Sequence, residues 1–217
     1  MSAYFEKRKK TGFSVKVKNL FGYGIVKLTR AMSGLGKRAQ PTVLCVATTG
    51  LGDSLMITPA IKALKTSMPH LKITMLVTDA SYHVFKSSAF VDDFLVFRKG
   101  RGVIGLFARL VRSRFSYGFI FHASDRLVWM LASATAGKVI AGDWQSIDVP
   151  RSLITNWYQT PHREHRIISH LKMAKAMFSG VDLSETDMVF DVLPSLSQNA
   201  REWLLGQTES PEPVGRV

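Results

Sequence analysis

From residue 42 onward, short apolar runs alternate with longer segments in which apolar residues recur at helical spacing. Five runs have the length and composition of buried strands, at 42–47, 72–77, 93–97, 117–122 and 138–142. Strands and helices that alternate in this way are typical of a parallel sheet covered by helices on both faces. The sequence therefore predicts an α/β fold built on a doubly wound parallel sheet.

Apolar residues at helical spacing place helices between and after these strands. The expected helical segments include a face made by Ile57, Ala60, Ile61 and Leu64, and the ranges 79–89, 103–114, 127–136, 163–180 and 197–205. In 103–114 the predicted inward side holds Ile104, Phe107, Leu110 and Val111, and in 163–180 it holds Ile167, His170, Leu171, Ala174 and Met177. The polar stretch 143–161 is expected to be irregular.

The first 40 residues differ sharply from the rest, because they hold ten basic residues and one acidic residue, a net charge of +9 out of +13 for the whole chain. We treat 1–40 as a basic leader and 206–217 as a linker by composition. In the leader, Val17, Leu20, Phe21, Gly24, Ile25 and Leu28 form one apolar stripe at helical spacing. Such a helix can lie on an anionic membrane surface. A flexible solubilising tail and a polyanion-binding segment are the alternatives.

The leader has neither the apolar core of a secretory signal nor a run long enough to span a bilayer. We therefore expect the protein to stay in the cytoplasm. The single cysteine, Cys45, rules out an intrachain disulfide. No nucleic-acid-binding motif is visible, so nucleic acid is not an expected partner.

Ligands of doubly wound sheets bind beyond the carboxyl ends of the strands. This rule draws attention to the segments 48–53, 122–126 and 142–146. The first of them, Thr-Thr-Gly-Leu-Gly-Asp, lies between a strand and a helix, where glycines permit a close approach of the backbone to a ligand. It lacks the third glycine of a dinucleotide fingerprint and the Gly-Lys of a P-loop. Asp53 in this segment is either the cap of the following helix or a general base for a sugar hydroxyl.

The run from Val43 to Leu64, with its Thr-Thr-Gly-Leu-Gly-Asp loop followed by Thr-Pro-Ala, resembles the opening of glycosyltransferase family nine, the ADP-heptose:lipopolysaccharide heptosyltransferases. Further similarities lie at Met68-Pro69, in the strand after Phe115, in 132–142, in Gly-Asp-Trp-Gln-Ser at 142–146 and in 165–180. Together they cover about residues 41–205. The resemblance implies a Rossmann-like domain, the N-terminal half of a GT-B fold, whose two domains face each other across a cleft.

The resemblance also implies an inverting, metal-independent transfer of heptose or a related sugar from a nucleotide sugar, such as ADP-heptose, to a lipid-linked core sugar. No cofactor and no metal are expected. Asp53 matches the family's general base, and Thr48, Thr49, Gly50, Gly52 and Ser54 match the loop that shapes the acceptor site. The donor domain has no counterpart here, so we expect this chain to be inactive without it, whether as a truncated protein or with a separate chain as partner.

Other candidates for acceptor contact are His122, Asp125, Arg126, Trp144 and His165. His122 and the residues after it depart from the family, which often has an acidic residue at the end of this strand. The spacing of His162, His165 and His170 does not favour a metal site. Arg109, Arg112 and Arg114 are either a solvated face or a phosphate contact. The alternative functions are a non-catalytic basic α/β module that binds a membrane or polyanion, and an unrelated nucleotide-binding protein.

Overall fold

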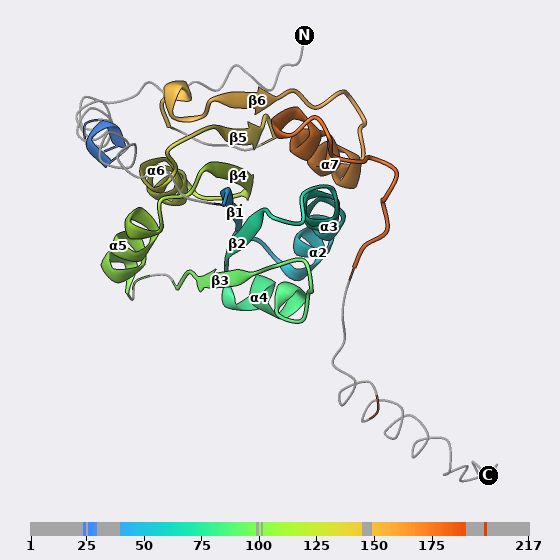
Figure 1. Ribbon diagram of the computed structural model, residues 1–217, viewed down its shortest axis with the longest axis horizontal. Helices are drawn as coiled ribbons and strands as arrows, with labels where there is room; N and C mark the ends of the chain where they lie inside the picture. The colour runs from blue at the N-terminus through green and yellow to red at the C-terminus, as the bar shows by residue number, and fades with distance from the viewer. Residues whose placement is uncertain are drawn as a thin grey trace, which may run out of the picture.

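The computed structural model describes residues 24, 26–29, 40–98, 100, 102–144, 149–189 and 198. Its centre is a six-stranded sheet in which every neighbouring pair is parallel, in the order β3-β2-β1-β4-β5-β6 (Figure 1). The strands are β1 (Thr42–Ala47), β2 (Lys72–Val77), β3 (Asp93–Val96), β4 (Tyr117–His122), β5 (Val139–Gly142) and β6 (Asn156–Tyr158). The predicted doubly wound parallel sheet is confirmed.

Helices cover both faces of the sheet, with α5 and α6 on one side and α3, α4 and α7 on the other (Figure 1). The helical elements are α2 (Leu51–Leu55), α3 (Thr58–Ser67), α4 (Asp79–Phe85), α5 (Val103–Ser113), α6 (Asp125–Ala134), the 3-10 turn η2 (Arg151–Leu153) and α7 (Arg166–Met177). Each helix that follows a strand starts at the carboxyl edge of the sheet, by which we mean the side where the strands end. The crossover helix then returns the chain to the side where the next parallel strand begins.

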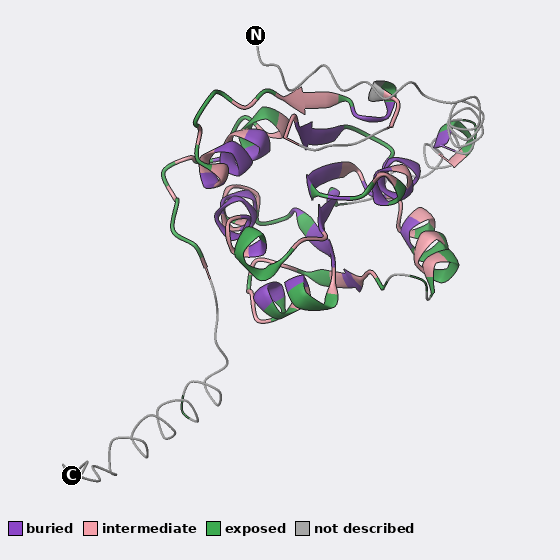
Figure 2. Cartoon of the chain, turned by 180° about the vertical axis from the view of Figure 1, so that it is seen from behind, coloured by how far each residue is buried: buried purple, intermediate pink, exposed green. Residues whose placement is uncertain are grey.

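Burial on both faces explains why β1 reads as an unbroken apolar run. Val43, Cys45 and Ala47 point into the core beneath α3, α4 and α7, whereas Leu44 and Val46 point into the core beneath α5 and α6. All six residues of β1 are buried, and burial raises the pKa of the Cys45 thiol well above its usual range. Figure 2 shows how the buried residues gather on the sheet and on the inward sides of the helices.

Four sequence expectations need correction. Residues 143–161 are not wholly irregular, because η2 and the edge strand β6 lie within them. The helix expected at 79–89 ends at Phe85, and the loop expected at 48–53 turns into α2 at Leu51. In α5 the side chain of Ile104 does not face inward but is 86% exposed, and Leu110 is the fully buried residue. The predicted inward face of α7 is confirmed, with Met177 half-buried.

Of the leader, the structure describes Gly24 and residues 26–29, which are helical. Val26 packs against Ala132 and Leu153, so the inward contact comes from a residue outside the predicted apolar stripe. Leu28, which belongs to that stripe, is 64% exposed. Gln40, the last leader residue, is described and exposed, whereas the other leader residues and the helix expected at 197–205, apart from Gln198, lie outside the described residues. Among the described helices, none combines the length and apolarity that a bilayer span requires.

Candidate functional site

The strand order reverses between β1 and β4, and the loops that follow these two strands are joined at this switch point. The backbone N–H and the hydroxyl of Thr48 both donate to the carbonyl oxygen of His122, at 3.0 and 3.1 Å. In return, Nδ1 of His122 lies 3.0 Å from the carbonyl oxygen of Thr48. Because a carbonyl only accepts, Nδ1 of this exposed imidazole carries a proton and donates to it. Thr48 and His122 thus lie in contact at the floor of the candidate site.

A shift in register next to this contact bends β4. Val46 pairs with Ile120, but the next residue, Ala47, pairs with His122, so Phe121 is an extra residue in the ladder. Bulges of this kind re-aim side chains and are common beside active sites. Here the bulge brings His122 level with the end of β1, where its ring reaches Thr48.

Asp53 is the third residue of α2 and is exposed at the carboxyl edge of the sheet. Its Oδ2 accepts a hydrogen bond of 2.7 Å from the hydroxyl of Thr49. The residue at the N-cap position is Gly50, and no side chain caps the helix, so the alternative in which Asp53 caps a helix is wrong. The carboxylate is oriented by one neighbour and open to solvent on its other side, which is what a general base needs before its substrate arrives.

The loop before α2, the helix that holds Asp53, is hydrogen-bonded to the neighbouring β2–α4 connection. The hydroxyl of Ser81 donates to the carbonyl oxygen of Thr49 at 2.7 Å, and the hydroxyl of Thr78 lies 3.4 Å from the same oxygen. Thr78 also caps α4 by accepting from the backbone N–H of Ser81. The position of Thr49 and, through it, that of the Asp53 carboxylate is therefore set by contacts from the start of α4 as well as by its own loop.

Gly50 and Gly52 stand in open space, since a methyl group added at either would meet no atom within 4 Å. Neither adopts a positive φ angle, so their backbone does not itself require glycine. What remains is room for a close ligand approach. Ser54 differs from the other loop candidates, because it is fully buried and its hydroxyl donates to the carbonyl oxygen of Gly50 at 2.8 Å.

A second group of side chains, contributed by α7 and the end of β5, lies against α2. His170 is only 3% exposed, and its Nδ1 lies 3.0 Å from the carbonyl oxygen of Met56, the residue that ends α2. Its ring packs edge-on against Phe121 and Trp144, at 5.3 and 5.4 Å between centroids. The guanidinium carbon of Arg166 lies 4.4 Å from the centre of the Trp144 ring, a cation–π contact.

Two charges of opposite sign act on His170 in this group. Burial lowers the pKa of His170 to about 4, and Arg166 lowers it further, whereas the Met56 carbonyl and the Asp53 carboxylate raise it. The imidazole is therefore neutral near pH 7 and lies between a cation and an anion. Arg166 makes no hydrogen bond or ion pair with another described residue, so its donors remain open to an anionic group.

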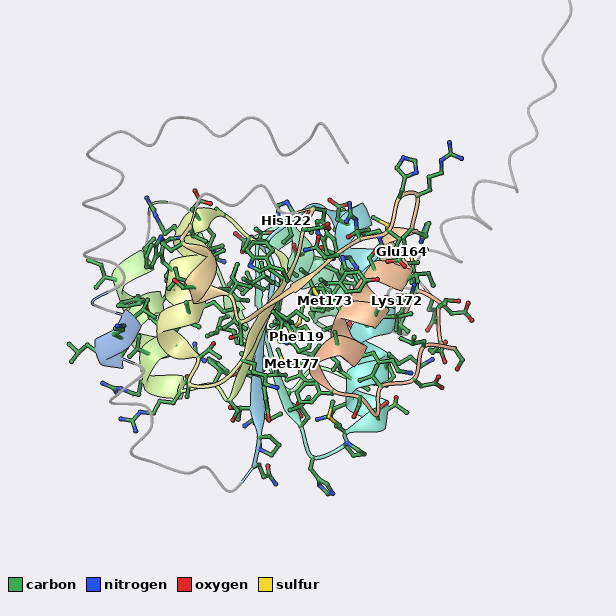
Figure 3. All side chains as sticks on the ribbon, turned by 90° about the horizontal axis from the view of Figure 1, so that it is seen from above. Phe119, His122, Glu164, Lys172, Met173 and Met177 are labelled. Carbon is green, nitrogen blue, oxygen red and sulfur yellow. The ribbon has the colours of Figure 1, made fainter. Side chains whose placement is uncertain are left out.

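Glu164 anchors the start of α7. Its side chain is 7% exposed, and Oε2 accepts hydrogen bonds from the hydroxyls of Tyr158 and Ser169, at 2.7 and 2.9 Å, while Oε1 pairs with the ammonium of Lys172. Burial raises the pKa of Glu164, but the hydrogen bonds from Lys172, Tyr158 and Ser169 outweigh it and hold the pKa below its usual value. Burial and the same carboxylate raise the pKa of Tyr158. Figure 3 shows Glu164 and His122 toward the same edge, with α7 running away from it to Met177.

The other predicted site residues take different positions at this edge. Trp144 is half-buried, with its indole N–H 3.5 Å from the carbonyl oxygen of Phe121. His165 is the N-cap of α7, where its Nδ1 accepts from the backbone N–H of Ile167 at 3.3 Å. Asp125 lies in the first turn of α6, and Arg126 next to it is exposed. Across the residues that the structure describes, no three His, Cys, Asp or Glu side chains are grouped so that they could hold a metal ion.

The sequence did not single out Arg166 and Glu164, and it gave His170 only a packing role or a place in an unfavoured metal cluster. The feature that could have identified them is a cluster of polar residues at the start of the helix that follows the last strand. Since β6 was not predicted, nothing in the sequence placed the start of α7 at the carboxyl edge of the sheet.

The strand order, the two helical layers and the polar loops at the switch point define a Rossmann-like α/β domain of the kind that makes up half of a GT-B glycosyltransferase. No protein-family model matches the sequence, and no curated protein sequence matches it either. Solved structures do match. A family 9 glycosyl transferase from Veillonella parvula aligns with 81% of this chain and 52% of its own length, at a TM-score of 0.67 and 16% identity.

Two Escherichia coli enzymes have the same fold. ADP-heptose lipopolysaccharide heptosyltransferase II aligns with 79% of this chain and 51% of its own length, at a TM-score of 0.59 and 11% identity. The heptosyltransferase WaaC with ADP aligns with 68% of this chain and 50% of its own length, at a TM-score of 0.56 and 16% identity. These likenesses confirm the Rossmann-like, GT-B-type fold that the sequence resemblance implied. The chain spans about half the length of the transferases that it matches.

Proposed function

We propose that this chain is the acceptor-binding half of a glycosyltransferase that transfers heptose or a related sugar to a lipopolysaccharide core acceptor. The observation that carries the proposal is the exposed Asp53 carboxylate at the switch point of the sheet, oriented by the hydroxyl of Thr49. Open space at Gly50 and Gly52 leaves room for a bulky sugar to approach the loop. The fold is that of enzymes whose names describe this activity.

In the proposed reaction, Asp53 accepts the proton of an acceptor hydroxyl as the hydroxyl oxygen attacks the anomeric carbon of the donor sugar. The bond from that carbon to the nucleoside diphosphate breaks on the opposite face, so the configuration inverts. No metal or cofactor takes part in this scheme. Thr49 holds the carboxylate in place, Thr48 and His122 supply hydrogen-bonding groups at the same end of the sheet, and the ring of Trp144, which packs against His170, supplies an aromatic surface. Ser54, which is buried, has no role as a ligand contact in the proposal.

The remaining parts of the enzyme come from outside the described domain. ADP-heptose, or another nucleotide sugar, would bind a second Rossmann-like domain, either in the same polypeptide or in a separate chain. Because the acceptor is a lipid-linked sugar, the enzyme would work in the cytoplasm at the surface of the inner membrane. Arg126 and His165 are exposed at the same edge and are the proposed contacts to outer parts of the acceptor. Asp125, in the first turn of α6, is next to Arg126 in the chain.

Isothermal calorimetry on the 217-residue chain tests the proposal, with a Kdo-containing lipid A core and ADP-heptose as the two ligands. Acceptor binding without donor binding is the expected result. Tight binding of ADP-heptose alone would favour the alternative of a nucleotide-binding Rossmann-like protein. Equal binding to anionic vesicles with and without the core sugar would contradict sugar recognition and favour the non-catalytic membrane-binding module.

A further inference from the structure

Helix α5 is unusual because the protein covers its apolar side incompletely. Six of its eleven residues are large and apolar, yet only Leu110 is fully buried. Val103, Leu106, Phe107 and Val111 are half-buried, and Ile104 is 86% exposed. Figure 2 shows α5 mainly in the colours of half-buried and exposed residues, unlike the neighbouring α6. The rest of the domain therefore leaves part of the apolar stripe of α5 uncovered.

The uncovered side of α5 combines apolar and cationic groups. Ile104, Gly105, Ala108, Arg109 and Arg112 are all exposed, with Ile104, Ala108 and Arg112 in one row at four-residue spacing and Gly105 and Arg109 in the adjacent row. The sequence from Arg98 to Arg114 holds six basic residues and no acidic one. The acidic groups that reach them are exposed themselves. Asp93 lies 3.8 Å from Arg109 and Asp79 pairs with Arg98, and pairs between exposed groups are weak.

The described part of the leader lies on the same side of the molecule. Val26 packs onto α6, so Lys27 and Leu28 are exposed on the outer side of that segment. Figures 1 and 3 both place this short helix and α5 on the flank of α6. Leu28 and Ile104 are two of the four large apolar side chains that are conspicuously exposed in the described part of the chain.

We propose that α5 and residues 26–29 form a membrane-binding face that docks on an anionic lipid bilayer. An isoleucine and two arginines on the exposed side of one helix fit the boundary of a bilayer, where the apolar group enters the acyl region and the guanidinium groups contact lipid phosphates. A polyanion without lipid would leave Ile104 in water. This proposal does not depend on the chain being a glycosyltransferase. If it is one, docking on the bilayer would bring it to its lipid-linked acceptor.

The topology relates this face to the candidate site. Helix α5 follows β3 and precedes β4, so its first turn, which holds Ile104, starts at the carboxyl edge of the sheet. Asp53 is exposed at the same edge. With α5 lying in the plane of the bilayer surface, the edge that carries Asp53 would stand beside the lipid head groups, within reach of a sugar that projects from a lipid anchor.

A fluorescent probe tests the docking directly. Cys45 is fully buried, so in an Ile104→Cys variant of the full chain the new thiol is the accessible one. An environment-sensitive dye on it should shift to shorter wavelength with vesicles of equal parts phosphatidylcholine and phosphatidylglycerol, and not with phosphatidylcholine alone. The matched control is Lys175→Cys on α7, on the opposite face of the sheet, where no shift is expected.

Sedimentation with the same mixed vesicles measures the contribution of the arginines. The double variant Arg109→Gln, Arg112→Gln should bind about thirtyfold more weakly, since each basic residue near an anionic surface contributes about fivefold in affinity. Lys86→Gln, Lys175→Gln makes the same charge change on α4 and α7 and should bind like the unaltered chain. No shift at position 104, or full binding by the arginine variant, would overturn the proposal. A shift caused by dimerisation of the chain, seen by light scattering without vesicles, would overturn it as well.

Discussion

Nδ1 of His170 lies 3.0 Å from the carbonyl oxygen of Met56 and joins the middle of α7 to the end of the short helix that carries Asp53. Because the carbonyl only accepts, Nδ1 must be protonated, and the ring is neutral with its lone pair on Nε2. A buried neutral imidazole thus holds α2 against α7. The charge of Asp53 is therefore not neutralised by a histidine cation close to it.

This contact predicts a loss of stability in acid. The pKa of His170 falls from 6.5 to about 4 in the folded protein, so the unfolded chain binds its proton first as the pH falls. The stability that neutral His170 contributes is complete above pH 6.5. It declines as the pH falls from 6.5 through about 4, by about 3 kcal/mol in the free energy of unfolding in total. Urea unfolding of the unaltered chain and of His170→Asn measures it, because asparagine can still donate to Met56 but does not titrate. Parallel pH profiles for the two proteins would contradict the assignment.

Glu164 should matter far more to stability than an exposed ion pair. Glu164→Gln removes the charge that Lys172, Tyr158 and Ser169 share, which should lower the free energy of unfolding by about 2 kcal/mol. Arg98→Gln breaks the exposed pair with Asp79 and should leave the free energy of unfolding almost unchanged, because solvent screens this pair. The pKa of Glu164 is lowered in the fold, so its contribution is present above the unfolded pKa and disappears as the pH falls below it. Equal losses in both variants would refute this contrast.

Two glycines at the carboxyl edge should respond in opposite ways to a methyl group. In Gly142→Ala the new Cβ would lie 2.1 Å from the Trp144 ring, so the ring must leave its place beside His170 and stability should fall by about 1–3 kcal/mol. Gly52→Ala meets nothing within 4 Å inside α2 and should keep or raise stability by up to about 1 kcal/mol. Thermal unfolding separates the two. If the open space at Gly52 is used by the acceptor, the same stable variant should lose acceptor affinity in calorimetry.

Asp53→Asn should separate chemistry from folding. In an enzyme completed by its donor-binding half, we expect transfer to fall by at least about a hundredfold, because a general base is removed. Stability should change by less than about 1 kcal/mol, since the exposed carboxylate accepts one hydrogen bond, from Thr49, and otherwise acts through its charge on the start of a short helix and on neutral His170. The matched control is Asp79→Asn, an exposed aspartate in the first turn of α4 at the same edge. Turnover of Asp53→Asn within tenfold of the unaltered enzyme would remove Asp53 from the mechanism.

Strongly buried elements could be predicted from the sequence and weakly buried ones could not. The strands β1, β2 and β4 match their predicted ranges because both faces of their central residues are covered, so these residues are nearly all apolar. The edge strand β6 has three half-buried residues with no alternation, so no periodic signal marks it. In helix α5 the prediction of the inward side was wrong at Ile104, which lies at the margin of the apolar stripe and is left exposed.

The candidate site was predictable where it lies in one loop and not where it is assembled from distant parts. The run from Thr48 to Asp53 stands directly after a strand, so the topology alone placed it at the carboxyl edge. The partners of that loop come from far along the chain, such as Ser81 on Thr49 and His170 on Met56. Such contacts depend on strand order and on helix packing, which a single sequence does not specify.

The most direct test of the account is a backbone-amide NMR titration of the 217-residue chain with a soluble core-sugar acceptor that lacks its lipid chains. We predict that the largest shift changes fall in 48–53 and 122–126, the two loops joined by Thr48 and His122. ADP-heptose added in its place should move neither loop. Absence of any change at saturating acceptor, or changes that leave both loops untouched, would contradict an acceptor site at the switch point of the sheet.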